Sequence, residues 1–334
     1  MNDLPLFSKR TLIVAFEGWN DAGEAATSAV KVIAEEIGAE TVLSIDPEEY
    51  CEFHYARPQV YFDEDGNRQL RWPATDLMVP SAEVIAEHPE WANLFILIGV
   101  EPALRWRSFA AEVLEIIDDR EIEAVLFVGA MLADVPHTRP ITVTASSQSE
   151  AVRNELEVEK SDYEGPVGIL TVLSQALEIE GIPAVSVWAQ VPHYVHNAPS
   201  PKVTLALLVE IERLLRTSFG HADLSTEAFE WERGIDEIAE GDEEMAQYIQ
   251  QLEKNRDELS QAEGSGDVLA EEFEKFLRDK AQKDRGLGLD EIDFGGFTAR
   301  GDSAQGDSPQ EDSTQPDSER PDSEKPDSEK PDEN

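Results

Sequence analysis

Short apolar runs alternate with helical patterns through residues 9–220. Runs of this length, rich in β-branched residues and bounded by Gly, Pro and polar residues, are typical of buried strands. The segments between several of them repeat apolar residues at helical spacing, so the alternation predicts an α/β fold with a mainly parallel sheet flanked by helices. The expected strands are Thr11–Phe16, Thr41–Ile45, Leu94–Val100, Ala124–Val128, Ile141–Ala145 and Val185–Val191.

Local signals mark the turns and helix ends. Asp21 with Glu24 three residues later matches a capping box that opens a helix, and Gly38 is placed to end it. Alternating apolar residues on both sides of Asp65-Gly66 predict an antiparallel hairpin inserted into the α/β alternation. Further helices are expected from Glu101-Pro102 to Ile117, from Gly168 to about Ile179, and over Lys202–Phe219.

The C-terminal third has a different composition. Residues 227–259 and 268–283 are heavily charged but repeat apolar residues at helical spacing, which predicts an acidic helical appendage docked on the core or on a partner. From about residue 286 the chain is Gly-rich and then repeats Pro-Asp-Ser-Glu, a composition that predicts disorder. We therefore expect an α/β domain over 9–220, a helical appendage over 223–285 and a disordered acidic tail over 286–334.

Charge and cysteine content exclude several classes of protein. A formal net charge of −44 repels phosphate, so a nucleic-acid-binding role is not expected. The one cysteine, Cys51, excludes an internal disulfide and a cysteine metal cluster. Neither a signal peptide nor an apolar run of membrane-spanning length is evident, so a cytoplasmic protein that binds neither nucleic acid nor membrane is expected.

Polar residues follow the ends of three expected strands. Because the carboxyl ends of parallel strands lie at one edge of a sheet, these residues are expected to converge there. Glu17, His137 and His193 are candidate acid/base groups, although the catalytic residues, if any, stay unknown. Candidate ligand-binding residues are Trp19, Asn20, Asp21, Arg139, Tyr194, His196, Asn197 and Gly168.

Each candidate also has a structural interpretation. Asp21 can be a helix cap, the histidines can be packing residues, and Arg139 can pair with one of the many acids. No HExxH pattern accompanies His193 and His196, so no metal site is expected. No P-loop lysine follows Gly168 and no GxGxxG follows the first strand, so no nucleotide cofactor is expected.

Several segments together resemble the PAC2 family, in its actinobacterial branch. They are Glu17–Gly23, Pro136–Pro140, Tyr163–Pro166, Trp188–Val195 and Pro199–Leu208. The resemblance covers roughly residues 9–220. It implies an α/β sandwich similar to nucleoside phosphorylases, often oligomeric, in a family named after a proteasome assembly chaperone. Other members are labelled carboxylate-amine ligases without agreed catalytic residues, so the resemblance transfers none.

Two functional hypotheses follow. The first is a homo-oligomeric interaction protein, an assembly factor or chaperone-like scaffold, that binds an unidentified protein partner without covalent chemistry. The second is an enzyme or binding protein for a nucleoside, phosphate or carboxylate, of phosphorylase, hydrolase or carboxylate-amine ligase type, working at the strand ends. Family members that dock on proteasome rings end in a hydrophobic-Tyr-X tail, and this sequence ends in Lys330–Asn334, so docking by that route is not expected.

Overall fold

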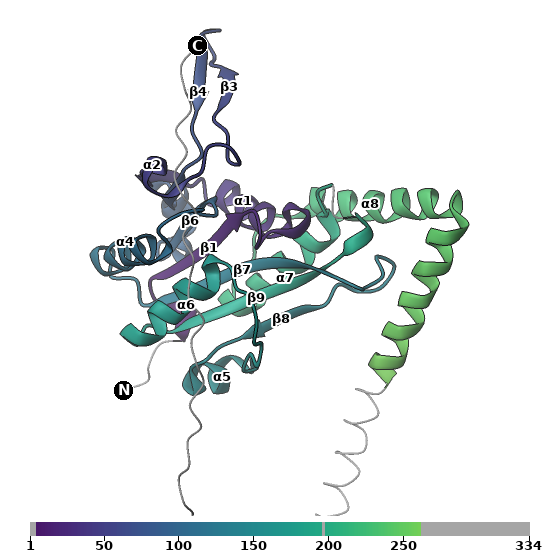
Figure 1. Cartoon of the computed structure of the whole chain (residues 1–334). Coiled ribbons are helices and arrows are strands. Elements are labelled where there is room, and N and C mark those ends of the chain that lie inside the picture. Colours follow the sequence, from purple (N-terminus) through teal and green to yellow (C-terminus); the bar gives the residue numbers. More distant parts are fainter. Residues whose placement is uncertain (1–4, 196–197, 262–334) are drawn as a thin grey trace, which may run out of the picture. The chain divides into compact units, whose positions relative to one another are not determined.

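The structure is a computed structural model that describes residues 5–195 and 198–261 (Figure 1). The helix expected over 268–283 and the tail expected over 286–334 lie outside the described residues. A seven-stranded sheet with the order β2-β5-β6-β1-β7-β9-β8 organises the described chain. Its strands are β1 (Thr11–Glu17), β2 (Glu40–Ile45), β5 (Thr75–Val79), β6 (Leu94–Val100), β7 (Ala124–Ala133), β8 (Val143–Ser146) and β9 (Ala184–Pro192).

The four central strands run parallel, as the sequence predicts. In β1, Ile13 pairs in register with Ile96 on one side and Leu126 on the other. Strand β9 pairs parallel with β7 over its full length, whereas β5 and β8 run antiparallel to their neighbours. The carboxyl ends of β6, β1, β7 and β9 therefore share one edge of the sheet, which we call the strand-end edge.

Helices cover both faces of the sheet (Figure 1). Alternate residues of β1 divide between two apolar clusters, because side chains on a strand point to opposite faces. Ile13 and Ala15 pack with α1 and α7, and Leu12, Val14 and Phe16 pack with α4 and α6. The helices are α1 (Ala25–Glu36), α2 (Pro47–Tyr50), α3 (Ala82–Glu87), α4 (Trp106–Asp119), α5 (Glu150–Leu156), α6 (Ile169–Glu180), α7 (Pro201–Leu215) and α8 (Ala222–Glu240), followed by a helical segment over 243–261.

The expected hairpin is confirmed. Strands β3 (Gln59–Phe62) and β4 (Arg68–Arg71) pair antiparallel as a separate two-stranded sheet. Its turn depends on Gly66, whose φ of 80° lies in the left-handed region that glycine tolerates at low cost. Figure 1 shows the hairpin projecting beyond α2.

The structure adds three details to these expectations. Strand β5 was not expected, since its five residues give too little pattern. The helix expected from Glu101 begins only at Trp106, because Arg105 adopts a left-handed conformation with a φ of 51°; before it, Ala103 and Leu104 donate their backbone N–H groups to the Tyr50 carbonyl. The helical pattern expected over 227–259 forms two helices with a break at Gly241, after which the Asp242 carboxylate accepts the N–H groups that open the second helix.

Candidate functional site

The loop after β1 presents two of its candidate residues to solvent. Glu17 is half-exposed and pairs with Lys31, with 3.1 Å between Oε1 and Nζ. The Trp19 side chain is 74% exposed and makes no part of the core. Both lie at the strand-end edge, as the sequence predicts, and both are exposed to solvent.

Asn20 joins two loops of the strand-end edge through Glu101. The buried Asn20 amide donates a hydrogen bond of 2.8 Å to Glu101 Oε1, and the same carboxylate oxygen accepts the Ile169 N–H at 3.0 Å, at the start of α6. Gly168 is required here because a Cβ at this position would lie 2.2 Å from Asn20 Oδ1. The Glu101 carboxylate accepts an N–H group at the start of α6, so this donor is not open to a free anion.

Asp21 acts as a helix cap, although not as half of a capping box. Its carboxylate accepts the N–H groups of Ala26 and Thr27 at 2.7 and 3.1 Å and the Thr27 hydroxyl at 2.5 Å. Glu24 does not return the contact: it adopts a left-handed conformation, with a φ of 50°, and is exposed. Burial raises the pKa of Asp21, and the hydrogen bonds from Thr27 partly oppose that shift.

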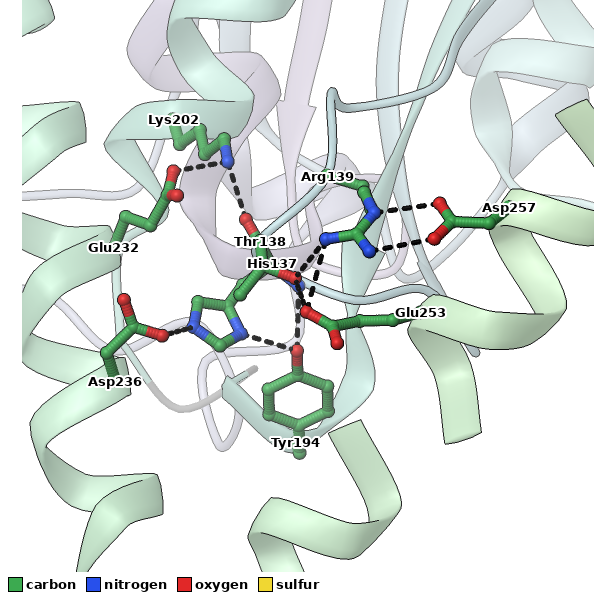
Figure 2. Close-up of polar contacts among 9 residues, drawn as sticks. All are labelled: His137, Thr138, Arg139, Tyr194, Lys202, Glu232, Asp236, Glu253 and Asp257. Carbon is green, nitrogen blue, oxygen red and sulfur yellow. Dashed lines mark hydrogen bonds and ion pairs between the residues drawn. The ribbon is translucent and has the colours of Figure 1, made fainter. Parts of the chain in front are cut away.

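His137 is fully buried beneath α8. The Tyr194 hydroxyl lies 2.8 Å from both the His137 backbone N and its Nδ1, and Asp236 Oδ1 lies 3.1 Å from Nε2 (Figure 2). Since the hydroxyl accepts the backbone N–H, its own proton is available to Nδ1, and Nε2–H then donates to Asp236. This pattern satisfies a neutral imidazole with both ring nitrogens bonded.

The electrostatic environment agrees with a neutral ring. Burial lowers the pKa of His137, and the hydrogen bond and charge of Asp236 oppose that shift. Burial also raises the pKa of Tyr194 to about 12, so its hydroxyl keeps its proton. A group that moves protons near neutral pH needs access to a substrate, and this imidazole is buried with both ring nitrogens bonded to Tyr194 and Asp236.

Arg139 holds the helical segment that follows α8. Its guanidinium forms two parallel hydrogen bonds of 2.8 Å to the Asp257 carboxylate and a third of 3.2 Å to Glu253 (Figure 2). The bond to Asp257 raises the pKa of Arg139, and it lowers the pKa of Asp257. Bidentate pairing fixes orientation as well as position, so Arg139 sets how this helix lies against the β7–β8 connection.

Lys202, at the start of α7, completes the cluster. Its ammonium group donates to the His137 carbonyl oxygen at 2.5 Å and pairs with Glu232 of α8. The Thr138 hydroxyl donates to Glu253 at 2.5 Å. We call the nine residues drawn in Figure 2 the His137 cluster: His137, Thr138, Arg139, Tyr194, Lys202, Glu232, Asp236, Glu253 and Asp257.

His193 lies beside the cluster. Its Nδ1 is 3.3 Å from Asp134 Oδ1, and its ring packs edge-on against Tyr194 and Tyr248. His196 and Asn197 lie outside the described residues. Among the residues that the structure describes, no three His, Cys, Asp or Glu side chains gather as a metal ion would require. No helix in that part of the chain is long and apolar enough to cross a membrane.

The arrangement joins the strand-end edge to residues 222–261, which we call the acidic segment. Sequence reasoning brought His137, Arg139, His193 and Tyr194 to one edge, and the structure places them together there. It missed Glu101, Lys202 and the four acids of the cluster. The only signal for those acids was that Arg139 has an unassigned partner. Chemically, the cluster supplies hydrogen bonds and ion pairs that attach a strongly charged surface to a rigid sheet.

Comparison with known proteins identifies the family. The PAC2 family model matches residues 15–239, which include the α/β core from the second half of β1 onward and nearly all of α8, and this chain belongs to the PAC2 family. No curated protein matches the sequence.

Two actinobacterial crystal structures are similar. One is a proteasome-assembly chaperone homologue from Mycobacterium tuberculosis, with 40% identity, 72% of this chain and 99% of that chain covered, and a TM-score of 0.63. The other is a PAC2 family protein from Streptomyces avermitilis, with 38% identity, the same coverage and the same TM-score. A proteasome activator from Pyrococcus furiosus shares the fold at 14% identity, covering 71% of this chain and 96% of that chain with a TM-score of 0.53.

Proposed function

We propose that this protein is an assembly-chaperone-like factor that acts by binding other proteins, in the cytoplasm and as a homo-oligomer, without covalent chemistry. The observation that carries the proposal is the 40% identity to a chain described as a proteasome-assembly chaperone homologue, over 99% of that chain. A role for this protein in proteasome assembly is part of the proposal. The small-molecule hypothesis is less well supported, because its candidate groups His137 and Arg139 are bonded to the acidic segment.

The surface we assign to partner binding is the outer face of the acidic segment. Residues 222–261 contain thirteen Asp and Glu residues and only three Lys and Arg residues. The His137 cluster uses four of the acids to attach the segment, and other acids point outward. Exposed acids on this face are Glu227, Glu230, Glu240 and Glu244. A rigid acidic surface favours a partner with a basic surface, because complementary charge speeds association and selects against acidic proteins.

The test is reconstitution with separately purified proteasome α and β subunits of the organism that supplies this chain. We expect the full chain to bind an α subunit and to increase the yield of assembled particles on native gels. Replacing Glu227, Glu230, Glu240 and Glu244 with Gln is expected to weaken that binding and its salt dependence.

The matched control removes the same number of exposed acids elsewhere. Glu83 and Glu87 of α3 with Asp118 and Asp119 of α4 are exposed and lie outside the acidic segment. Their replacement by Gln or Asn is expected to leave binding unchanged. Failure of the unaltered chain to bind any subunit would disprove the proteasome role, and equal losses in both variants would disprove the assigned surface.

A further inference from the structure

The Glu101 carboxylate is fixed at the strand-end edge with one acceptor position open. Its Oε1 accepts two N–H groups, from Asn20 Nδ2 at 2.8 Å and from the Ile169 backbone at 3.0 Å. A carboxylate oxygen has two lone pairs, so Oε1 is fully used. Within the described part of the chain, Oε2 accepts the Trp19 backbone N–H at 3.3 Å and no other hydrogen bond. One lone pair of Oε2 is therefore available to a further donor.

The negative charge of Glu101 is not paired with a Lys or Arg among the residues that the structure describes. Arg105, in the same loop, pairs with Glu49, and Lys31 of α1 pairs with Glu17. Glu101 is also partly buried. Because water screens a partly buried charge less than an exposed one, Glu101 gains more from a cation than the solvated acids of this chain do.

Four large apolar side chains in the loops that meet at Glu101 are exposed. Trp19 donates its backbone N–H to this carboxylate, and Leu104 follows Glu101 in the same loop. Val167 lies just before α6, and the Tyr163 hydroxyl donates to a backbone carbonyl of that loop at 3.0 Å. The exposed fractions are 74% for Trp19, 46% for Leu104, 65% for Tyr163 and 40% for Val167. Exposed apolar groups in the loops that hold a charged group indicate a ligand that is itself both apolar and charged.

A lysine side chain has this combination of properties. Its four-carbon stem covers apolar surface while its ammonium group stays at a polar partner, and aromatic rings such as Trp19 attract cations. Arginine binds a carboxylate best through two parallel hydrogen bonds, one to each oxygen. Since Oε1 of Glu101 already accepts two N–H groups, the second of these bonds has no acceptor. An ammonium group needs Oε2 alone, so the site favours lysine over arginine.

The carboxylate is held in place before any ligand arrives. Asn20, which bonds to it, is 1% exposed, and a Cβ at Gly168 would lie 2.2 Å from the Asn20 Oδ1. The amide is therefore packed tightly between the loop after β1 and the start of α6. A binding group that is already fixed loses less conformational entropy on association than a free surface side chain. Glu101 is in this respect a better receptor for a cation than a solvated glutamate.

We propose that Glu101 and the exposed apolar side chains of its loops form a binding site for a lysine side chain of a partner protein. The ammonium group donates to Glu101 Oε2, and the stem lies over apolar side chains such as Trp19. The site is formed by the loops after β1 and β6 and the loop before α6, outside the acidic segment. This inference rests on the proposed protein-binding function and adds to it a contact with a defined side chain.

The test is titration of the full chain with short capped peptides in which the central residue, flanked by leucines, is lysine, arginine or norleucine. The readout is the NMR signal of the Trp19 indole N–H, identified by its loss in Trp19→Phe. The lysine peptide is expected to shift this signal saturably. Norleucine keeps the stem without the ammonium group and is expected to bind roughly tenfold more weakly. The arginine peptide has the same charge and is expected to bind roughly threefold more weakly.

A double-mutant cycle assigns the ammonium group to Glu101. Glu101→Gln keeps an oxygen that can accept the N–H groups of Asn20 and Ile169, and it is expected to bind the lysine peptide as weakly as the norleucine peptide. Glu83→Gln removes the same charge from the exposed surface of α3 and is expected to bind all three peptides as the unaltered chain does.

Three results would each overturn the inference. They are equal binding of the lysine and arginine peptides, which would show attraction by net charge alone, equal binding of the lysine and norleucine peptides, and equal losses in Glu101→Gln and Glu83→Gln. The peptide comparison uses the unaltered chain and does not depend on the folding of a variant. No proteasome subunit is present and the acidic segment is unchanged throughout, so these results do not bear on subunit binding by that segment.

Discussion

The acidic segment and the β3–β4 hairpin are both additions to the same α/β core. They differ in how far their apolar side chains are buried and in how their charged side chains are paired. The acidic segment buries apolar residues such as Ile235 and Leu252, and its inward acids are bonded through the His137 cluster. The hairpin leaves Phe62 and Leu70 exposed. Unsatisfied apolar surface on an ordered element points to an intermolecular contact, whereas satisfied polar groups point to attachment within the chain.

The largest expected change in stability comes from replacing a leucine with alanine in the acidic segment, and the same replacement in the β3–β4 hairpin is its comparison. Leu252→Ala removes a side chain that is 5% exposed and is expected to lower the free energy for opening the acidic segment by about 2–4 kcal/mol. Leu70→Ala removes a side chain that is 56% exposed and is expected to change the stability of the single chain by less than about 0.5 kcal/mol.

Denaturant unfolding and hydrogen exchange of residues 243–261 measure the two effects. Exchange identifies whether the helical segment opens by itself or with the core. Similar losses in both variants would show that the hairpin is packed within the single chain, contrary to the comparison above.

Histidine offers a second matched pair. His137→Ala removes a buried ring that is bonded to Tyr194 and Asp236, and the loss is expected to be about 2 kcal/mol because both partners are left without it. His54→Ala removes a side chain that is exposed and pairs only locally with Glu52, and little change is expected. Thermal unfolding measures both, and limited proteolysis of residues 222–261 shows where the first variant is loosened. A His137 variant as stable as the unaltered chain would contradict the attaching role of the cluster.

The sequence predicts the core more completely than the site. Every residue of β1 up to Phe16 is buried, so the apolar run predicts a strand without any knowledge of its neighbours. The turn at Gly66 predicts the hairpin in the same local way. Half-buried β5 carries no comparable pattern in its five residues.

The partners in the site are non-local. His137 and Arg139 were placed at the strand-end edge because parallel strands share that edge. Their acids, Asp236 and Asp257, lie 99 and 118 residues further along the chain. The sequence contains 71 acidic residues, and spacing alone cannot choose among them. Which acids pair with His137 and Arg139 is determined by the packing of α8 and of the helical segment after it.

A smaller change in folding stability is expected when the pH is lowered. The pKa of His137 is lowered by burial from the unfolded value of 6.5, so below pH 6.5 the unfolded chain binds a proton that the folded chain does not. The stability contributed by the neutral ring is complete above pH 6.5 and is lost as the pH falls toward the lowered pKa. His137→Gln does not titrate, so the stability difference between the unaltered chain and this variant is expected to shrink over that interval. Denaturant unfolding at several pH values measures it, and a difference that grows on acidification would contradict the buried neutral imidazole.

The smallest change in global stability is expected from replacing Arg139. Its partners are accessible to water, and the ion pairs of partly exposed groups contribute little to global stability. Arg139→Gln is therefore expected to leave the unfolding transition nearly unchanged while it speeds hydrogen exchange locally around Glu253 and Asp257, because the bidentate contact that orients the helix is lost. Lys254→Gln, which removes an i,i+4 pair with Glu258 on the same helix, is the control and is expected to alter exchange less. If both variants alter exchange equally, Arg139 acts as one more surface charge and the orientation of the acidic segment depends on its buried apolar residues alone.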